Sequence, residues 1–322
     1  MRELTYVQAL RTALREEMQR DPNVFLMGED IGDWGGTFKV TEGLIDEFPG
    51  RVLDTPLSES GTVGAAVGAA LVGMRPVIEI MFMDFITCAM DPVVNQAAKL
   101  HFMSGGKAKV PLVIRAPEGG GVNAAAQHSQ CLEAWFMHVP GLKVVMPSDA
   151  VDAYGLLKAS VRDDNPVMFI EGKRLYSRKA ALSDDEFVIP LGKAEVKRPG
   201  RDVTMVAISA AVPLALEAAG KLVGEGIEVE VIDPRTIAPL DRGTILNSVK
   251  KTGRLVVVHE AVVQGGVSAE ISAMVTAEAF DYLDAPVLRV ATPPTPIPFS
   301  QSLEPAVLPD VEKIVAAVRR VL

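Results

Sequence analysis

Two residues of the sequence combine a proton-transferring side chain with a place after an apolar strand. Glu59 lies between such a strand and a helix rich in small residues, and His128 follows a loop with three glycines at 119–121. Carboxylates and imidazoles are common proton carriers in catalysis, and loops at strand ends often carry function. Each residue also has an ordinary interpretation, Glu59 as a first-turn acid favoured by the helix dipole and His128 as a loop histidine bonded to backbone.

The other histidines and the two cysteines favour structural roles. No two of His101, His138 and His259 have the spacing of metal ligands. With only Cys88 and Cys131, a disulfide framework or a cysteine zinc site is not expected, and both residues are read as reduced thiols. The sequence therefore predicts no metal centre built from histidine or cysteine.

Glycine-rich phosphate-binding motifs are absent. The chain has no G-x-x-x-x-G-K-[ST] string, and the glycines at 61, 64 and 68 fall within the predicted helix instead of forming a strand-to-helix turn. Small residues from 61 to 70 indicate a helix that packs closely against a neighbour.

The elements that must position these residues alternate between short apolar strands and helical patterns. Strands are expected at 24–27, 51–53, 76–80, 111–115, 142–146 and 166–170. Helices are expected at Asp84–Met103 and Asp149–Val161, each opening on a possible capping aspartate, and near the N-terminus around Leu10 and Leu14. This alternation predicts an α/β fold with a parallel sheet between two helical layers.

A second series of strands and helices predicts a second α/β domain. Strands are expected at 203–208, 228–232, 255–258 and 287–289, and helices at 213–224, 244–251, 268–280 and 310–322. The last of these helices opens on Asp310, a possible cap. Segment 181–200 holds a run of acidic residues and a Pro-Gly pair, which is typical of a connection. We therefore expect a first domain at 1–185, a linker at 186–200 and a second domain at 201–322.

Composition excludes several classes of protein. The 322 residues are 48% hydrophobic and 23% charged, which is typical of globular proteins and not of disordered ones. A net charge of −9 disfavours nucleic-acid binding. No apolar run is long enough to span a membrane, and the start of the chain lacks the pattern of a signal peptide, so a cytoplasmic protein is expected.

Several strings together resemble the β subunit of thiamine diphosphate-dependent 2-oxo acid dehydrogenase E1 components. They are MGEDIG at 27–32, DTPLSESG at 54–61, RPVIEIMFMDF at 75–85, NQAAKLHFMSGGK at 95–107, QHSQCLEAW at 127–135, the segment 140–167, EVIDPRTIAPLD at 230–241 and VKKTGRLVVVHEA at 249–261. The resemblance covers essentially the whole chain in order. Pyruvate and acetoin dehydrogenases are the most similar types.

The resemblance implies a transketolase-like pyrimidine-binding domain followed by a transketolase C-terminal-like domain, each a three-layer parallel-sheet unit. In this family the α subunit holds the cofactor diphosphate through Mg²⁺ with a GDG motif and a later asparagine, a pair that this sequence lacks. An α₂β₂ assembly is therefore implied, with the active site between chains. The implied enzyme decarboxylates a small 2-oxo acid, with pyruvate as the leading candidate, or cleaves acetoin. It then reductively acylates the lipoyl group of an E2 acyltransferase. The final domain is expected to contact E2 and other subunits.

The resemblance also assigns site residues. Glu59 matches the glutamate that hydrogen-bonds the aminopyrimidine ring of thiamine diphosphate, and Met81 and Phe85 match positions that line this ring. His128 matches the active-site histidine that faces the substrate and the lipoyl dithiolane. Without the resemblance, Met81 and Phe85 would be read as core residues.

Five further positions match a structural potassium site of some family members: Leu112, Ser160, Val161, Asp163 and Asn165. Backbone oxygen ligands suit this hard cation. Asp163 and Asn165 could equally be turn formers before a proline.

Three other interpretations remain open. The first is a branched-chain 2-oxo acid dehydrogenase E1 β subunit. The second is half of a split transketolase-like enzyme, whose sugar phosphate substrates would need basic residues that the matched loops scarcely offer. The third is a non-catalytic organising subunit, against which the presence of Glu59, Phe85 and His128 argues.

Overall fold

The N-terminal part of the chain builds a seven-stranded sheet. In the computed structural model, which describes residues 1–322, its strands are β2 (Val24–Gly28), β3 (Val52–Asp54), β4 (Arg75–Glu79), β5 (Val113–Glu118), β6 (Lys143–Val145), β7 (Val167–Gly172) and β12 (Thr236–Ala238). They lie in the order β12-β6-β7-β5-β4-β2-β3, and only β12 is antiparallel to its neighbour. The six parallel strands predicted from apolar runs are all present, with ends shifted by at most three residues.

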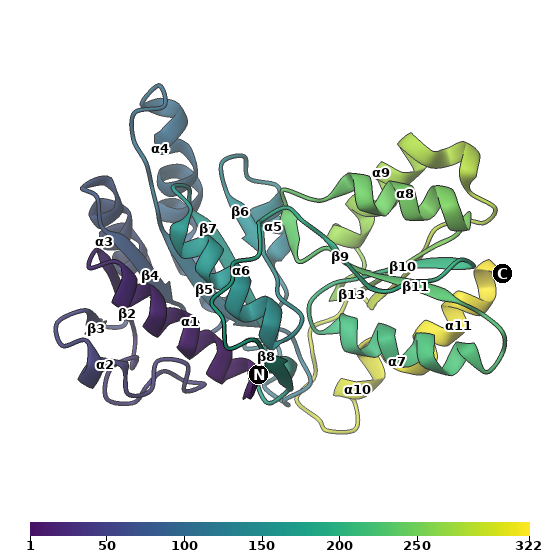
Figure 1. Ribbon diagram of the computed structural model, residues 1–322, viewed down its shortest axis with the longest axis horizontal. Helices are drawn as coiled ribbons and strands as arrows, with labels where there is room; N and C mark the ends of the chain where they lie inside the picture. The colour runs from purple at the N-terminus through teal and green to yellow at the C-terminus, as the bar shows by residue number, and fades with distance from the viewer.

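Helices cover both faces of this sheet (Figure 1). They are α1 (Tyr6–Arg20), α2 (Leu44–Glu47), α3 (Glu59–Leu71), η1 (Met83–Ala89), η2 (Asp91–Ala97), α4 (Ala98–Met103), α5 (Glu133–Met137) and α6 (Ala150–Arg162). Ile78 and Ile114 pack with the α3 and η1 layer, while their neighbours Val77 and Val113 pack with α1 and α6. Because successive side chains of a strand point to opposite faces of the sheet, each strand contributes residues to two separate hydrophobic cores.

The C-terminal part forms a second three-layer unit beside the first (Figure 1). Its sheet, in the order β14-β13-β10-β11-β9, consists of β9 (Glu195–Arg198), β10 (Val203–Ala207), β11 (Val229–Asp233), β13 (Leu255–Val262) and β14 (Leu288–Thr292). Its helices are α7 (Ala211–Val223), α8 (Arg242–Thr252), α9 (Val267–Ala279), η4 (Phe280–Tyr282), α10 (Glu304–Val307) and α11 (Val311–Val321). Helices α7 and α11 cover one face, and α8 and α9 cover the other. No helix combines the length and the apolar character that a membrane span requires.

The capping residues act as the sequence predicted at two helices. The side chain of Asp149 accepts a hydrogen bond from the amide of Asp152 at the start of α6. The side chain of Asp310 does the same for the amide of Lys313 at α11. Each cap satisfies an amide that would otherwise lack a partner.

The helix expected at Asp84–Met103 is wrong as a single α-helix. The structure has a 3₁₀ segment (η1), a π segment (η2) and only then α4. Asp84 lies inside η1 and accepts hydrogen bonds from Gln130 instead of capping a helix. Pro92, at the start of η2, explains part of the irregularity because it lacks an amide hydrogen and its ring clashes with the preceding turn.

The connection between the domains holds more structure than expected. Within 186–200, strand β9 pairs antiparallel with β11 and forms the edge of the second sheet. Strand β12, from the second half of the sequence, crosses back to pair with β6 of the first sheet. Two further strands, β1 (Arg2–Thr5) and β8 (Lys179–Leu182), pair as a separate antiparallel ribbon that the sequence did not predict. Each large sheet is therefore parallel with one antiparallel edge.

Two glycines of α3, Gly64 and Gly68, have no close neighbour within this chain, whereas Ala66 and Ala70 of the same helix are buried in the core. A Cβ atom built on Gly64 or Gly68 meets nothing within 4 Å. Leu71 and Val72 at the end of this helix are exposed. The close packing predicted for these glycines therefore has no partner among the elements of the chain itself.

Candidate active site

The candidate residues gather at one edge of the first sheet. Strands β3, β2, β4, β5 and β7 are parallel neighbours, so their carboxyl ends meet at that edge. Glu59 follows β3, Met81 and Phe85 follow β4, and His128 lies in the loop after β5. This edge is where open α/β sheets commonly bind ligands.

Glu59 is the first residue of α3 and is half-buried. Ser58 caps the helix, with its hydroxyl oxygen accepting from the amide of Gly61 at 3.3 Å. A hydrogen bond of 3.2 Å between the hydroxyls of Thr62 and Thr55 ties the first turn to the preceding segment. Local contacts thus place a carboxylate at the positive end of a helix dipole.

A second carboxylate, Glu29, lies beside Glu59 and follows β2. Burial and the charge of Glu59 raise the pKa of Glu29, while a hydrogen bond from the backbone of Ser58 opposes this rise. An acid whose pKa is raised beside a second carboxylate is suited to proton transfer. Glu29 was not among the residues predicted from the sequence, although its place directly after an apolar strand was a usable signal.

His128 packs against two phenylalanines from the segment after β4. Its ring centroid lies 4.8 Å from that of Phe82 with the planes at 86°, and 5.4 Å from that of Phe85 at 76°. The two phenylalanine rings are themselves 5.6 Å apart. Edge-to-face contacts of this kind restrict how the imidazole turns. Phe82 is a further residue that the sequence analysis did not assign to the site, and Met81 is half-buried next to it.

Lys173, just after β7, contacts both His128 and Phe82. Its ammonium donates to the backbone carbonyl of His128 and lies 5.2 Å from the ring centroid of Phe82. Burial lowers the pKa of Lys173. The side-chain amide of Gln130 donates to Asp84 at 2.8 Å and holds the loop on its other side.

A buried ion group fixes the strands beneath the site. The guanidinium of Arg115 on β5 donates to Glu79 on β4 at 2.6 Å and to Glu171 on β7 at 2.7 Å. The Tyr176 hydroxyl donates to Glu171 at 2.8 Å. Because the charged side chains of Arg115, Glu79 and Glu171 are buried, losing one of them would leave a charge without compensation.

A second buried cluster lies at the domain boundary. Glu133, at the start of α5, has a carboxylate oxygen 2.5 Å from Nε2 of His259 on β13. Burial and the neighbouring Glu133 raise the pKa of Glu118 far above its usual range. The ligand atoms of Glu118, Cys131 and Glu133 lie within 4.8 Å of one another. His259 thus contacts a buried carboxylate, and its structural role stays a prediction.

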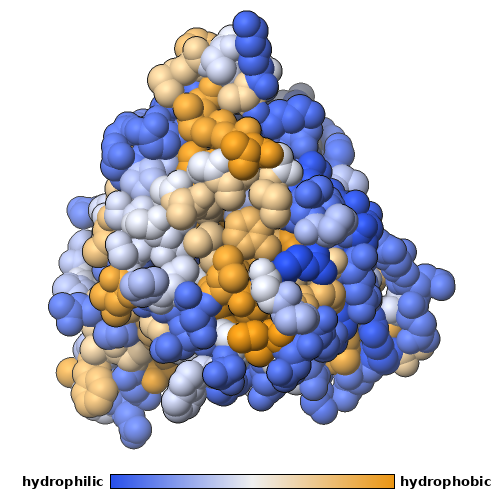
Figure 2. Space-filling model, turned by 90° about the vertical axis from the view of Figure 1, so that its left-hand side faces the viewer, coloured by the Kyte–Doolittle hydropathy of each residue, from blue (hydrophilic) through white to orange (hydrophobic).

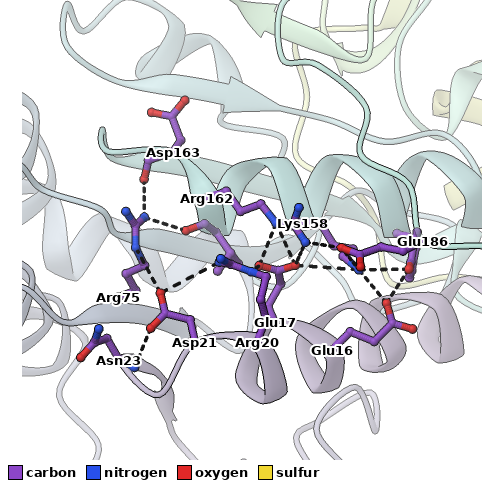
Figure 3. Close-up of polar contacts among 12 residues, drawn as sticks. Glu16, Glu17, Arg20, Asp21, Asn23, Arg75, Lys158, Arg162, Asp163 and Glu186 are labelled. Carbon is purple, nitrogen blue, oxygen red and sulfur yellow. Dashed lines mark hydrogen bonds and ion pairs between the residues drawn. The ribbon is translucent and has the colours of Figure 1, made fainter.

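Four of the residues matched to a potassium site lie at or just after the end of α6, and Leu112 directly precedes β5. Figure 3 shows Asp163 of this group beside Arg75. The guanidinium of Arg75 donates to the backbone carbonyls of Val161 at 2.9 Å and Asp163 at 3.0 Å. The carbonyl of Leu112 accepts from the amide of Val167, and that of Ser160 accepts from the amide of Asp163. Each of these carbonyl oxygens has a second lone pair that could bind a cation. The positive charge of Arg75, however, already lies beside the carbonyls of Val161 and Asp163.

Asp163 and Asn165 form a turn by themselves. The carboxylate of Asp163 accepts from the backbone amide and the side-chain amide of Asn165, both at 2.9 Å. The same carboxylate pairs with Lys143. The turn-forming interpretation thus accounts for both side chains, and a potassium ion there stays a prediction.

Comparison with known proteins gives the same picture along the whole chain. Residues 2–179 match the family described as transketolase, pyrimidine binding domain, and residues 192–314 match transketolase, C-terminal domain. The chain is 48% identical to the pyruvate dehydrogenase E1 component subunit beta of Rhizobium meliloti (strain 1021), over 100% of this chain and 70% of that protein. It is 49% identical to a mitochondrial subunit beta-2 of Oryza sativa subsp. japonica, over 99% and 86%.

Two other relatives extend the comparison. The acetoin:2,6-dichlorophenolindophenol oxidoreductase subunit beta of Bacillus subtilis (strain 168) is 46% identical over 100% of this chain and 98% of that protein. A solved structure described as a split gene transketolase, inactive beta4 tetramer, matches with a TM-score of 0.83 and 26% identity over 99% of this chain and 98% of that one. The chain therefore belongs to the family of β subunits of thiamine diphosphate-dependent pyruvate and acetoin dehydrogenases, which are built on the transketolase fold.

Proposed function

We propose that this chain is the β subunit of an α₂β₂ E1 enzyme that decarboxylates pyruvate or cleaves acetoin and passes the acyl group to a lipoyl group of E2. The observation that carries the proposal is the meeting of Glu59, Phe85 and His128 at one sheet edge in a chain 46–49% identical to such subunits. A non-catalytic organising subunit would have no need of this arrangement.

The residues at the sheet edge fit the pyrimidine half of thiamine diphosphate. Glu59 would hold a ring nitrogen by a charge-assisted hydrogen bond, and Met81 and Phe85 would hold the flat ring through a polarizable thioether and an aromatic face. When bound, the cofactor supplies the nucleophilic carbon and the electron sink. The protein contributes position and the movement of a proton at the Glu59 carboxylate.

His128 serves the later stage of this proposal. Its imidazole, held between Phe82 and Phe85, would donate a proton to the sulfur that leaves when the dithiolane opens. The aromatic contacts restrict the orientation of the ring, which is half-buried. A role in substrate binding alone would not require a titratable side chain.

The α subunit is expected to complete the site from the face that carries α3 and α4. Figure 2 shows apolar residues gathered in a band on this side of the molecule. Large exposed hydrophobic residues in or next to α3 and α4 are Leu57, Val72, Phe102 and Met103. Glu59 begins α3, so a partner on this face would lie next to it. We propose that this partner supplies the Mg²⁺ and diphosphate ligands that the sequence lacks, and that the C-terminal domain contributes subunit and E2 contacts.

Co-purification with the α subunit tests the proposal. We expect the isolated chain to bind thiamine diphosphate weakly and to have no turnover, whereas the assembly binds the cofactor. Micromolar affinity of the isolated chain in calorimetry, together with measurable decarboxylation, would contradict this. A substrate panel with thiamine diphosphate and Mg²⁺ should give activity with pyruvate or acetoin. Preference for branched-chain 2-oxo acids would identify the related branched-chain type, and ketol transfer between sugar phosphates would contradict the proposal.

A potassium ion at the α6 terminus and a cytoplasmic location complete the proposal as secondary points. Replacing K⁺ with a bulky organic cation should lower the melting temperature of the assembly if the ion is bound. A melting temperature that does not depend on K⁺ would support the turn interpretation of Asp163 and Asn165. Location needs a direct measurement, because relatives include both bacterial proteins and proteins named mitochondrial.

A further inference from the structure

The loop that carries His128 receives hydrogen-bond acceptors from the other domain. We call residues 119–132, between β5 and α5, the histidine loop. The amide of Gly120 donates to the Glu260 carboxylate at 2.5 Å, although Glu260 belongs to β13 of the C-terminal sheet. Glu260 is only 9% exposed. A buried carboxylate with a backbone amide as partner makes a strong, directional contact.

A second carboxylate of the C-terminal domain holds the next part of the same loop. Glu304, the first residue of α10, accepts from the amide of Gly121 at 2.9 Å and from the amide of Asn123 at 3.0 Å. Its side chain uses both oxygens and is 2% exposed. The two carboxylates together therefore bind three amides of the histidine loop.

The glycines of the loop allow this close approach. Gly119 has φ +91° and Gly121 has φ +87°, a region that favours glycine. A Cβ atom on Gly119 would lie 2.7 Å from a carboxylate oxygen of Glu260, and one on Gly120 would lie 3.2 Å from a carboxylate oxygen of Glu304. The absence of side chains in the glycine run therefore leaves room for the Glu260 and Glu304 carboxylates of the other domain.

The far end of the histidine loop is tied to the same domain. Glu133 follows the loop directly and contacts His259, the residue before Glu260 on β13. Consecutive residues of one strand therefore hold the loop at both ends. Burial lowers the pKa of Lys173, and the charges of Glu260 and Glu304 oppose this, so they also favour the ammonium that binds the carbonyl of His128.

We propose that Glu260 and Glu304 are positioning residues, through which the C-terminal domain sets the place of His128 for acyl transfer. The inference rests on the proposed function of His128 and adds to it. Both carboxylates are buried, so a docked E2 would not touch them. The C-terminal domain then contributes to the active site as well as to subunit contacts.

The test compares Glu304→Ala with the control Glu312→Ala, an exposed glutamate on α11, both in the assembled α₂β₂ enzyme. Glu304→Ala should lower overall complex activity by about three- to tenfold in kcat, with the KM of the oxo acid within about twofold. Decarboxylation measured with an artificial electron acceptor should be largely retained. Glu304→Gln, which keeps one oxygen acceptor, should restore part of the loss.

Two further measurements decide what a loss means. Amide hydrogen exchange at 120–123 should become faster in Glu304→Ala but not in the control. In a His128→Ala background, Glu304→Ala should cause no further loss, because the two changes act on one function. Unchanged exchange, or an equal further loss in that background, would overturn the proposal.

The same experiment separates this inference from the proposed function. If His128→Ala alone keeps full activity in both assays, the catalytic role of His128 is what fails, and with it the purpose of the positioning. Faster exchange in Glu304→Ala would then still support the contact that holds the loop. Unchanged exchange would overturn that contact regardless of activity.

Discussion

Glu59 and His128 share one edge of the sheet, but different parts of the chain hold them there. The contacts that place Glu59 are local, with the cap of Ser58 spanning three residues. The histidine loop is held by Lys173, Glu260 and Glu304, with separations of 45, 140 and 183 residues between donors and acceptors. A side chain at a capped helix start keeps its place whenever that helix folds, whereas the loop needs both domains docked.

Because of this difference, cofactor chemistry at Glu59 and acyl transfer at His128 should respond differently to substitutions that disturb the C-terminal domain. Glu59 depends on α3 and its packing in the first domain, so cofactor chemistry should tolerate disturbance of the C-terminal domain. His128 depends on the boundary between the domains, so acyl transfer should be lost first. Five substitutions test this difference.

Glu59→Gln should have the largest effect. The amide keeps the shape of the side chain but cannot carry the proton, so turnover should fall by about 10²-fold or more in both the artificial-acceptor and the complex assay. Saturating cofactor in steady-state kinetics isolates the rate from binding. The neighbouring substitution Ser60→Ala, on the exposed side of α3, is the control. Turnover near that of the unmodified enzyme would remove Glu59 from the catalytic assignment.

His128→Ala should separate the two assays. Complex activity through the lipoyl group should fall by about tenfold or more, because only that step needs the proton donor. Artificial-acceptor activity should be retained better. Equal losses in both assays would place His128 in substrate binding or decarboxylation, and no loss in either would leave it as an ordinary loop histidine.

Gly121→Ala and Gly64→Ala should have opposite effects on the stability of the isolated chain. At Gly121, φ is +87° and a Cβ atom would lie 2.5 Å from Cδ of Arg174, so a loss of about 1–3 kcal/mol is expected. At Gly64, within α3, the Cβ position is open and alanine should stabilise the helix by roughly 1 kcal/mol. Urea denaturation midpoints measure both. A stabilised Gly64→Ala chain that assembles poorly with the α subunit would support packing of the partner on α3.

Ser58→Ala should have the smallest effect. It removes the hydroxyl that accepts from the amide of Gly61, at a cost of about 1 kcal/mol. The midpoint of thermal unfolding of the isolated chain should fall slightly, and the histidine loop should keep its hydrogen-exchange rates. Faster exchange in that loop would show that the two regions are not independent.

Much of the fold follows from local pattern. Apolar runs and capping residues such as Asp149 and Asp310 predicted most strands and several helices, because period-two and helical alternation reflect burial on one or two faces. Asp84–Met103 was the exception, since Pro92 changes the hydrogen-bonding pattern in a way that apolar spacing does not reveal. Strands β9 and β12 were missed because short edge strands carry little pattern of their own.

The α/β class, the place of Glu59 at a helix start and the glycine run before His128 could all be predicted from the sequence alone. Three contacts became visible only in the folded chain: Phe82 packs on His128, Glu29 lies beside Glu59, and Glu260 and Glu304 bind the histidine loop. The physical reason is that caps and periodicity act within a few residues, where the chain's own geometry limits the partners. Contacts across 140 residues or more depend on how two separately folded sheets dock, which no local spacing records.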